Sequence, residues 1–271
     1  MSGAEDAAEI AIELRGVTKS FRGKPVLRGV DLAIRAGETT AILGGSGSGK
    51  SVCVKHMIGL LRADAGEIRV LGHDVTRFSE RSWVALRRDF GMVFQASALF
   101  DSLSVYENVA YPIRQHERWA EPRVAERVAS CLASVGLAGV EKLLPAELSG
   151  GMRKRVGVAR AIALTPKIIL YDEPTTGLDP ANSRRIGELI QRLQRELGST
   201  SVVVTHDLEL AFAIADRVAL LREGRIALEG PAHELRGSQH PALREFIEGV
   251  EVLPPAAAAA SATTRRGERN G

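Results

Sequence analysis

A short glycine-rich loop constrains this chain more than any other feature of its sequence. The loop follows an apolar run over residues 40–43, which predicts a buried strand, and precedes residues 52–61, which predict a helix. Glycines in such a loop let backbone N–H groups turn inward around phosphates, a lysine adds a positive charge, and a serine hydroxyl can ligate Mg²⁺. The positive end of the helix points at the same place, so we expect a phosphate-binding site. The residues of this loop are Gly44, Gly45, Ser46, Gly47, Ser48, Gly49, Lys50 and Ser51.

Length and charge limit the classes of function. A chain of 271 residues suits one large α/β domain with appendages or two modest lobes. Its 36 Lys and Arg against 33 Asp and Glu leave a net charge of +3, too small for a dedicated nucleic-acid surface, so we expect no nucleic-acid partner. Cys53 and Cys131 are expected to pack as small apolar side chains in a reduced, cytosolic protein. The sequence contains no run of 18 apolar residues, so we expect other subunits to provide any membrane-spanning part.

Strand patterns dominate the region before and just after the loop. Residues 10–14, 17–21, 27–34 and 38–43 alternate in the manner of short antiparallel strands with glycines between them. Residues 66–72 carry a further strand pattern and are expected to join the same sheet. The sequence therefore predicts a small antiparallel layer beside the phosphate loop.

Helical patterns replace strand patterns between residues 96 and 163, which predicts a helical insert, and Ser104 with Glu107 forms a capping-box pattern there. The strand, helix, strand alternation that follows predicts a mainly parallel sheet with right-handed crossovers. After Leu253 the sequence changes to two prolines, five alanines and then mainly Ser, Thr, Arg and Gly, without large apolar side chains, which predicts a disordered tail over residues 251–271. Further predicted helices cover 79–90, 104–110, 122–135, 149–164, 182–197, 232–235 and 241–249, and further strands cover 91–95, 167–173, 201–205, 217–221 and 225–229.

Polar residues follow several of these strands directly. Asp172 and Glu173 end an apolar strand, His206 follows residues 201–205, and Gln95 ends residues 91–95. Parallel strands place their carboxyl ends at one edge of a sheet, where ligands bind, so we expect these side chains around one phosphate site. Taken alone, the acidic pair is about as well explained by an N-cap or surface pair. His206 alone is more often a structural residue, and Gln95 alone is usually a strand-end polar group.

A second anion-binding pattern lies at Ser149, Gly150 and Gly151, just before a predicted helix. Ser149 can cap the helix while the glycines leave backbone N–H groups open. In a head-to-tail homodimer, such a site would close on the triphosphate held by the partner copy. Taken alone, the pattern is more typical of an ordinary capped helix. The basic run at residues 153–155 is interpreted as a solvated face or a dimer contact.

Taken together, the motifs resemble the nucleotide-binding subunit of ABC transporters. Phe21, GGSGSGKS, Gln95, LSGGM, IILYDE, the turn at residues 177–179 and His206 match that family in order and approximate spacing over residues 10–250. The resemblance implies an α/β P-loop NTPase fold, with a RecA-like parallel-sheet core, a small antiparallel β subdomain and a helical subdomain over about residues 96–163. It also implies ATP and Mg²⁺ as ligands and ATP hydrolysis as the activity.

The resemblance implies a role for each matching residue of the same copy. Phe21 would stack on adenine, where tyrosine is commoner, and residues 44–51 would wrap the phosphates, with Lys50 on the β and γ oxygens. The Mg²⁺ ion would be held by Ser51 and Gln95, with Asp172 reaching it through water. Glu173 would be the general base, and His206 would touch the γ-phosphate.

Other residues would act across a homodimer. Ser149, Gly150 and Gly151 of one copy would close on the nucleotide of the other, and Asp179 would belong to the loop that links the two sites. We therefore expect an isolated monomer to bind ATP and hydrolyse it poorly.

In several details these motifs resemble those of the Mla-type lipid transporters, whose complexes include Mce proteins. Met152 replaces the usual glutamine after LSGG, Val52-Cys53 replaces the commoner Thr-Leu, and ALFDSLSVYENVAYP and ILYDEPTTGLDP point the same way. The similarity implies phospholipid transport, transmembrane permease subunits, an Mce-type lipid-binding subunit, and a peripheral location on the cytoplasmic face of the inner membrane. Ala98, Leu99 and Phe100 are expected beside a groove for a helix of the permease.

Three alternatives remain open at this point. An ABC importer for an amino acid, metal or drug would share every motif, because cargo binds to other subunits. A non-transport ABC ATPase acting on the ribosome or DNA is disfavoured by the single cassette and the lack of sustained heptads. A P-loop GTPase would want an Asn-Lys-x-Asp element, which the sequence lacks, and would leave LSGGM unexplained.

Overall fold

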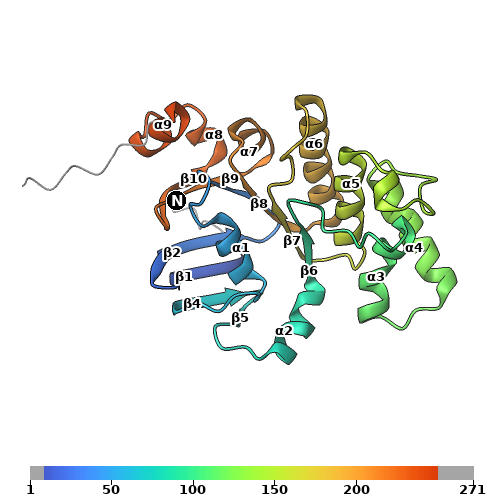
Figure 1. Cartoon of the computed structure of the whole chain (residues 1–271). Coiled ribbons are helices and arrows are strands. Elements are labelled where there is room, and N and C mark those ends of the chain that lie inside the picture. The colour runs from blue at the N-terminus through green and yellow to red at the C-terminus, as the bar shows by residue number, and fades with distance from the viewer. Residues whose placement is uncertain (1–8, 250–271) are drawn as a thin grey trace, which may run out of the picture.

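A computed structural model of the chain describes residues 9–249. In it, two β-sheets lie side by side, and a group of helices extends from the larger sheet on the side away from the smaller one (Figure 1). Within the described residues, no helix is both long and apolar enough to cross a membrane. The predicted disordered tail at 251–271 lies outside the described residues.

The larger sheet has six strands in the order β10-β9-β3-β8-β7-β6. Strands β3, β6, β7, β8 and β9 pair in parallel, and β10 is antiparallel to β9 at one edge. All residues of β3, β7 and β8 are buried, as expected of strands covered on both faces. The prediction of a mainly parallel sheet is therefore confirmed. Its strands are β3 (Thr39–Leu43), β6 (Phe90–Val93), β7 (Ile168–Asp172), β8 (Thr200–Thr205), β9 (Arg217–Arg222) and β10 (Arg225–Pro231).

The smaller sheet is antiparallel, in the order β2-β1-β4-β5. The prediction of four short strands before residue 44 was wrong in two respects. Residues 10–21 form one strand, because Gly16 takes a φ of 58° and absorbs an irregularity without ending the pairing. Residues 39–43 are apolar and fully buried, and they belong to the parallel sheet instead. The strands are β1 (Ile10–Phe21), β2 (Lys24–Arg35), β4 (Ala65–Val70) and β5 (His73–Asp74).

The helices largely follow the predicted ranges, with shifted ends. Helix α1 runs from Lys50 to Met57 instead of over 52–61, because the chain turns at Gly59, whose φ is 70°. A Cβ at Gly59 would lie 2.1 Å from the Trp83 ring, so the indole takes the space that a longer helix would fill. The others are α2 (Glu80–Leu86), α3 (Val105–His116), α4 (Glu121–Ser134), α5 (Gly150–Ala161), α6 (Pro180–Leu197), α7 (Leu208–Ile214), α8 (Ala232–Leu235) and α9 (Pro241–Glu248), with short 3-10 turns at Arg87–Asp89 and Pro145–Glu147.

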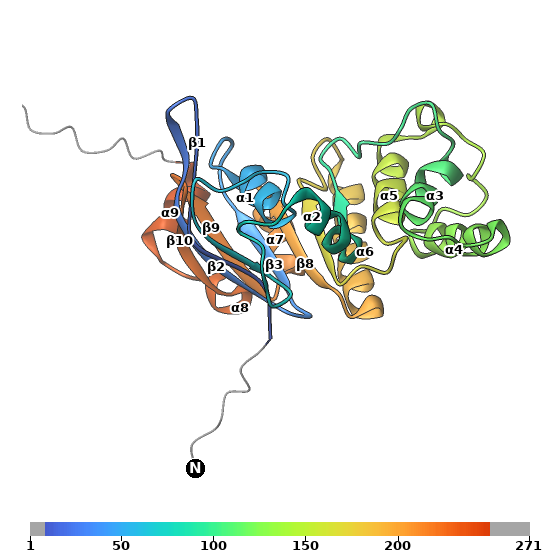
Figure 2. The same ribbon diagram turned by 90° about the horizontal axis from the view of Figure 1, so that it is seen from below.

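Helices α3, α4 and α5 form an arm on the β6 side of the larger sheet (Figures 1 and 2). The predicted capping box is present: Ser104 Oγ accepts from the Glu107 N–H at 3.2 Å, and Glu107 Oε2 accepts from the Ser104 N–H at 2.8 Å. The buried Asn108 side chain bonds both backbone groups of Phe100, which ties the loop before α3 to the arm. The limits of 96 and 163 for a helical subdomain stay a prediction.

Candidate functional site

The phosphate loop joins the carboxyl end of β3 to α1, as the sequence predicted. Two of its glycines have no room for a side chain. A Cβ at Gly44 would lie 2.5 Å from the Leu221 carbonyl oxygen, and a Cβ at Gly49, whose φ is 106°, would lie 2.9 Å from Leu27. The backbone of the loop is therefore held against β9 and β2.

Lys50 lies at the start of α1 and is only 7% exposed. Its Nζ donates to the carbonyl oxygens of Gly44 at 2.8 Å and Gly45 at 3.0 Å. The hydroxyl of Ser48 in the same loop is buried without a hydrogen-bond partner in the described chain. An ammonium held by loop carbonyls and a spare hydroxyl are donors that phosphate oxygens can accept from, so the loop fits a phosphate chain.

The first of the two carboxylates of the site, Asp172, is the last residue of β7. The Ser51 hydroxyl donates to Asp172 Oδ1 at 2.9 Å, which joins α1 to the sheet edge. Burial, together with the neighbouring Glu173, raises the pKa of the Asp172 carboxyl above its usual value, although the bond from Ser51 acts in the opposite direction. A hydroxyl and a carboxylate in contact form the oxygen donor set that Mg²⁺ prefers, and a bound cation would favour the charged carboxylate.

The second carboxylate, Glu173, lies between two other predicted site residues. Its Oε1 is 3.5 Å from Lys50 Nζ, and its Oε2 is 2.8 Å from His206 Nδ1. The Thr176 hydroxyl also donates to Oε2, at 3.3 Å. Glu173 takes a left-handed φ of 50°, and its N–H donates to the Val204 carbonyl on β8 at 2.9 Å. The carboxylate thus has a fixed position at the mouth of the phosphate loop.

Gln95 lies near the same edge, beyond the carboxyl end of β6. The predicted strand at 91–95 is shorter than expected, because β6 ends at Val93 and the chain then enters a turn in which Ser97 and Ala98 have φ values of 63° and 44°. The sheet order explains the grouping, since β3, β8, β7 and β6 are successive neighbours. Four strand ends that are distant in sequence therefore meet at one edge.

The structure does not bring every predicted residue to this edge. Phe21 ends β1 in the smaller sheet with 41% of its surface exposed. Ser149 begins the arm helix α5, and its Oγ accepts from the Met152 N–H at 3.2 Å. Asp179 caps α6 by accepting from the N–H groups of Ala181 and Asn182, each at 3.0 Å. Both caps are ordinary helix caps within one copy.

The basic run at residues 153–155 differs in part from its predicted role as a solvated face. Lys154 is 6% exposed, and its Nζ donates to the Gln95 carbonyl and, at 3.4 Å, to the Glu173 carbonyl. Arg155 donates to the carbonyls of Val135 and Gly136 at the end of α4. Lys154 and Arg155 are therefore not part of a solvated face, whereas Arg153 is exposed, and a dimer contact stays a prediction.

Comparison with known proteins agrees with this geometry. Residues 27–176 match the ABC transporter family. The "Probable ribonucleotide transport ATP-binding protein mkl" of Mycobacterium tuberculosis is 41% identical over 245 residues, 90% of this chain and 68% of the relative. The "Intermembrane phospholipid transport system ATP-binding protein MlaF" of Haemophilus influenzae is 40% identical over 238 residues, covering 88% and 90%.

A third relative is named for the transport of a different cargo. The "Methionine import ATP-binding protein MetN" of Symbiobacterium thermophilum is 43% identical over 245 residues, 89% of this chain and 74% of the relative. Among solved structures, the dimeric ATP-binding cassette MJ0796 in a post-hydrolysis state bound to ADP and Pi superposes with a TM-score of 0.76 at 34% identity, covering 82% of this chain and 98% of that one.

Proposed function

This chain belongs to the ABC transporter family, and from that premise we propose that it is the ATP-hydrolysing subunit of a phospholipid transporter. It has the fold of an ABC nucleotide-binding domain, and the family is an ATPase family. The phospholipid cargo is supported by the similarity to MlaF, which extends over 90% of that relative. Methionine is the second candidate cargo, because MetN is equally similar.

The observation that carries the ATPase chemistry is the fixed position of Glu173 between Lys50 and His206. In our proposal, Lys50 exchanges the carbonyls of Gly44 and Gly45 for the β and γ oxygens of ATP, and the N–H groups of residues 44–51 bind the same phosphates. Ser51, Gln95 and Asp172 would hold Mg²⁺, which would neutralise phosphate charge.

Glu173 then acts on the attacking water. Its carboxylate accepts the proton of a water that attacks the γ-phosphorus, ADP leaves, and the γ-phosphoryl group becomes inorganic phosphate. His206 holds Glu173 Oε2 through Nδ1 at 2.8 Å, which leaves the other ring nitrogen free to face the γ-phosphate. Phe21 is exposed at the end of β1 and is available to stack on adenine.

We further propose that the site is completed by a second copy of the chain. The MJ0796 cassette is dimeric, and Ser149, Gly150 and Gly151 lie in the arm, apart from the phosphate loop of their own copy (Figure 1). In the dimer, the start of α5 would close on the partner's γ-phosphate, and Asp179 would lie where the two sites meet.

Replacing Ser149 by arginine tests the second copy. The larger side chain would block the start of α5, so we expect ATP turnover to fall about 100-fold, as when a transition-state donor is removed, while ATP affinity changes less than about twofold. Turnover and equilibrium binding measured on the full chain would check this. Ser130→Arg, on the exposed face of α4, is the control for added charge and bulk. Unchanged turnover in Ser149→Arg would contradict a role across the dimer.

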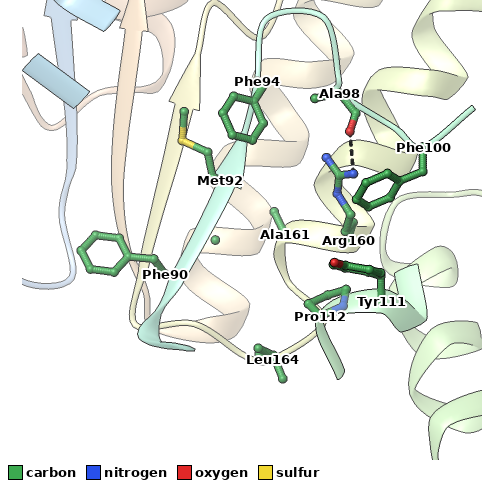
Figure 3. Close-up of a pocket in the computed structure, with 11 residues that line it drawn as sticks. Phe90, Met92, Phe94, Ala98, Phe100, Tyr111, Pro112, Arg160, Ala161 and Leu164 are labelled. Atoms are coloured by element: carbon green, nitrogen blue, oxygen red, sulfur yellow. Dashed lines mark hydrogen bonds between the residues drawn. The ribbon is translucent and has the colours of Figure 1, made fainter. Parts of the chain in front are cut away.

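An apolar groove beside β6 supports the assignment of a membrane partner (Figure 3). The groove has a volume of about 300 Å³, and Phe100 and Tyr111 lie at its rim, 42% and 41% exposed, with ring centroids 4.8 Å apart. We propose that a helix of a transmembrane permease binds here and holds the chain at the cytoplasmic face of the membrane. Ala98 and Phe100 line this groove, and Leu99 between them packs against the core of the arm.

Charged substitutions at the rim of this groove test whether a membrane subunit binds there. We expect Phe100→Glu combined with Tyr111→Glu to abolish co-purification with membrane subunits, because a carboxylate cannot be buried unpaired at an apolar interface. ATP binding by the isolated full chain should stay within about twofold, since neither residue touches the phosphate loop. Val84→Glu, which places the same charge on an exposed apolar position of α2, is the control. Intact assembly of the double variant would exclude this groove.

Cargo is tested by purifying the complex with its membrane subunits and identifying the bound lipid by mass spectrometry. We expect phospholipid and an Mce-type subunit in the complex. A complex without an Mce-type subunit, whose ATPase activity rises with methionine and its binding protein, would favour the importer function instead.

A further inference from the structure

Helix α5 holds two loops of the site by their backbone. Lys154 donates to the carbonyls of Gln95 and Glu173, which belong to different strand ends. Six residues further along the same helix, Arg160 donates to the carbonyl of Ser97 at 2.9 Å and to that of Ala98 at 2.7 Å. Figure 3 shows the bond to Ala98. The loop after β6 is thus bound to α5 at three carbonyls.

These loops have backbone conformations that need such support. Ser97, Ala98 and Glu173 all have a positive φ without being glycine, a conformation that side chains disfavour. The carbonyls of Ser97 and Ala98 accept from Arg160. The Glu173 carbonyl accepts from Lys154 and also from the Thr176 N–H at 3.3 Å. A lysine ammonium has three N–H donors and can bind two carbonyls at once, which is the geometry observed.

The ammonium of Lys154 is also placed close to the acidic pair. It is buried beneath Gln95 and Glu173, and its charge acts on the carboxylates of both Asp172 and Glu173. Burial lowers the pKa of Lys154, and the two carboxylates act against that shift. Glu173 therefore interacts with two buried cations, with Lys154 through its carbonyl and with Lys50 through its carboxylate at 3.5 Å.

We propose that Lys154 is a positioning residue that holds Gln95 and Glu173 at a fixed separation and joins both to the helix that carries Ser149. This inference rests on the proposed roles of Gln95 and Glu173. In the proposed dimer, the start of α5 faces the nucleotide bound by the partner copy. When that nucleotide moves the helix, Lys154 would pass the movement to Gln95 and Glu173 of its own copy, which serve the other site. Arg160 keeps the rest of the loop in the same rigid unit.

The test replaces Lys154 by methionine, which keeps the length of the stem and removes the charge and the donors. We expect kcat for ATP to fall about 10- to 100-fold in the full chain, as for a small displacement of reacting groups, with KM for ATP within about twofold. Hydrogen exchange of the nucleotide-free protein should speed up in the segment 94–100. Lys154→Arg, which retains the cation, should recover part of kcat.

Arg127→Met is the matched control. Arg127 also donates from a neighbouring helix to carbonyls of the α5 end, those of Ile162 at 2.7 Å and Ala163 at 2.9 Å, but it touches neither site loop. We expect it to lower the melting temperature and to leave kcat per folded molecule and exchange at 94–100 unchanged.

Several results would overturn the proposal. One is a kcat of Lys154→Met within twofold of that of the unmodified chain. Another is an equal loss of kcat in Arg127→Met. The third is a Lys154→Arg protein that is no more active than Lys154→Met. The Glu173→Gln variant separates this failure from failure of the site itself, since its loss of turnover tests the base and does not depend on Lys154.

Discussion

Replacing Glu173 by glutamine is expected to abolish ATP turnover while ATP still binds. The amide keeps the size of the side chain and can still bond His206, but it cannot accept a proton from the attacking water. Removal of a general base lowers turnover by about 10²- to 10⁴-fold. In the proposed dimer, hydrolysis would separate the two copies, so we also expect ATP to trap Glu173→Gln as a stable dimer.

The measurement is ATP hydrolysis within the assembled transporter, with the dimer followed by size-exclusion chromatography in the presence of ATP. Glu196→Gln, on the exposed surface of α6, is the control for loss of one carboxylate and should hydrolyse ATP normally. Normal ATPase activity of Glu173→Gln in the assembled transporter would rule out Glu173 as the base.

Replacing Lys50 by methionine should instead weaken the binding of ATP. The ammonium is the buried cation at the mouth of the phosphate loop, and its bonds to Gly44 and Gly45 show where its donors point. Loss of a hydrogen bond to a charged group costs about 2–3 kcal/mol, which corresponds to a roughly 30- to 150-fold weaker Kd for ATP. The change also removes the cation 3.5 Å from Glu173.

Equilibrium binding of ATP to the full chain checks this result. Lys167→Met, which removes an exposed lysine paired with Asp89, should bind ATP like the unmodified chain. An affinity of Lys50→Met within about twofold of the unmodified chain would mean that the loop does not bind the triphosphate through this lysine. Together, the two variants separate binding, which depends on Lys50, from chemistry, which depends on Glu173.

Local patterns predicted much of this fold. The capping box of Ser104 and Glu107 was read from a few adjacent residues and is confirmed. The strand predicted over residues 167–173 is also present, one residue shorter at each end, as Ile168–Asp172. Predictions failed where distant packing decides the outcome. Trp83 packs over Gly59, so α1 ends earlier than its apolar spacing suggested, and Gly16 absorbs a bulge that its residue type alone could not distinguish from a turn.

The sequence by itself determined the phosphate loop, because backbone N–H groups, a lysine and a serine within eight consecutive residues are enough to surround a phosphate chain. Only the tertiary structure decided what surrounds that loop. The order of β3, β8, β7 and β6 brings Gln95, Glu173 and His206 to one edge, and strand order depends on contacts between residues far apart in the chain. The burial of Lys154 was decided in the same way: a charged residue in a basic run leaves solvent only when other segments, here the carbonyls of two loops, are folded onto it.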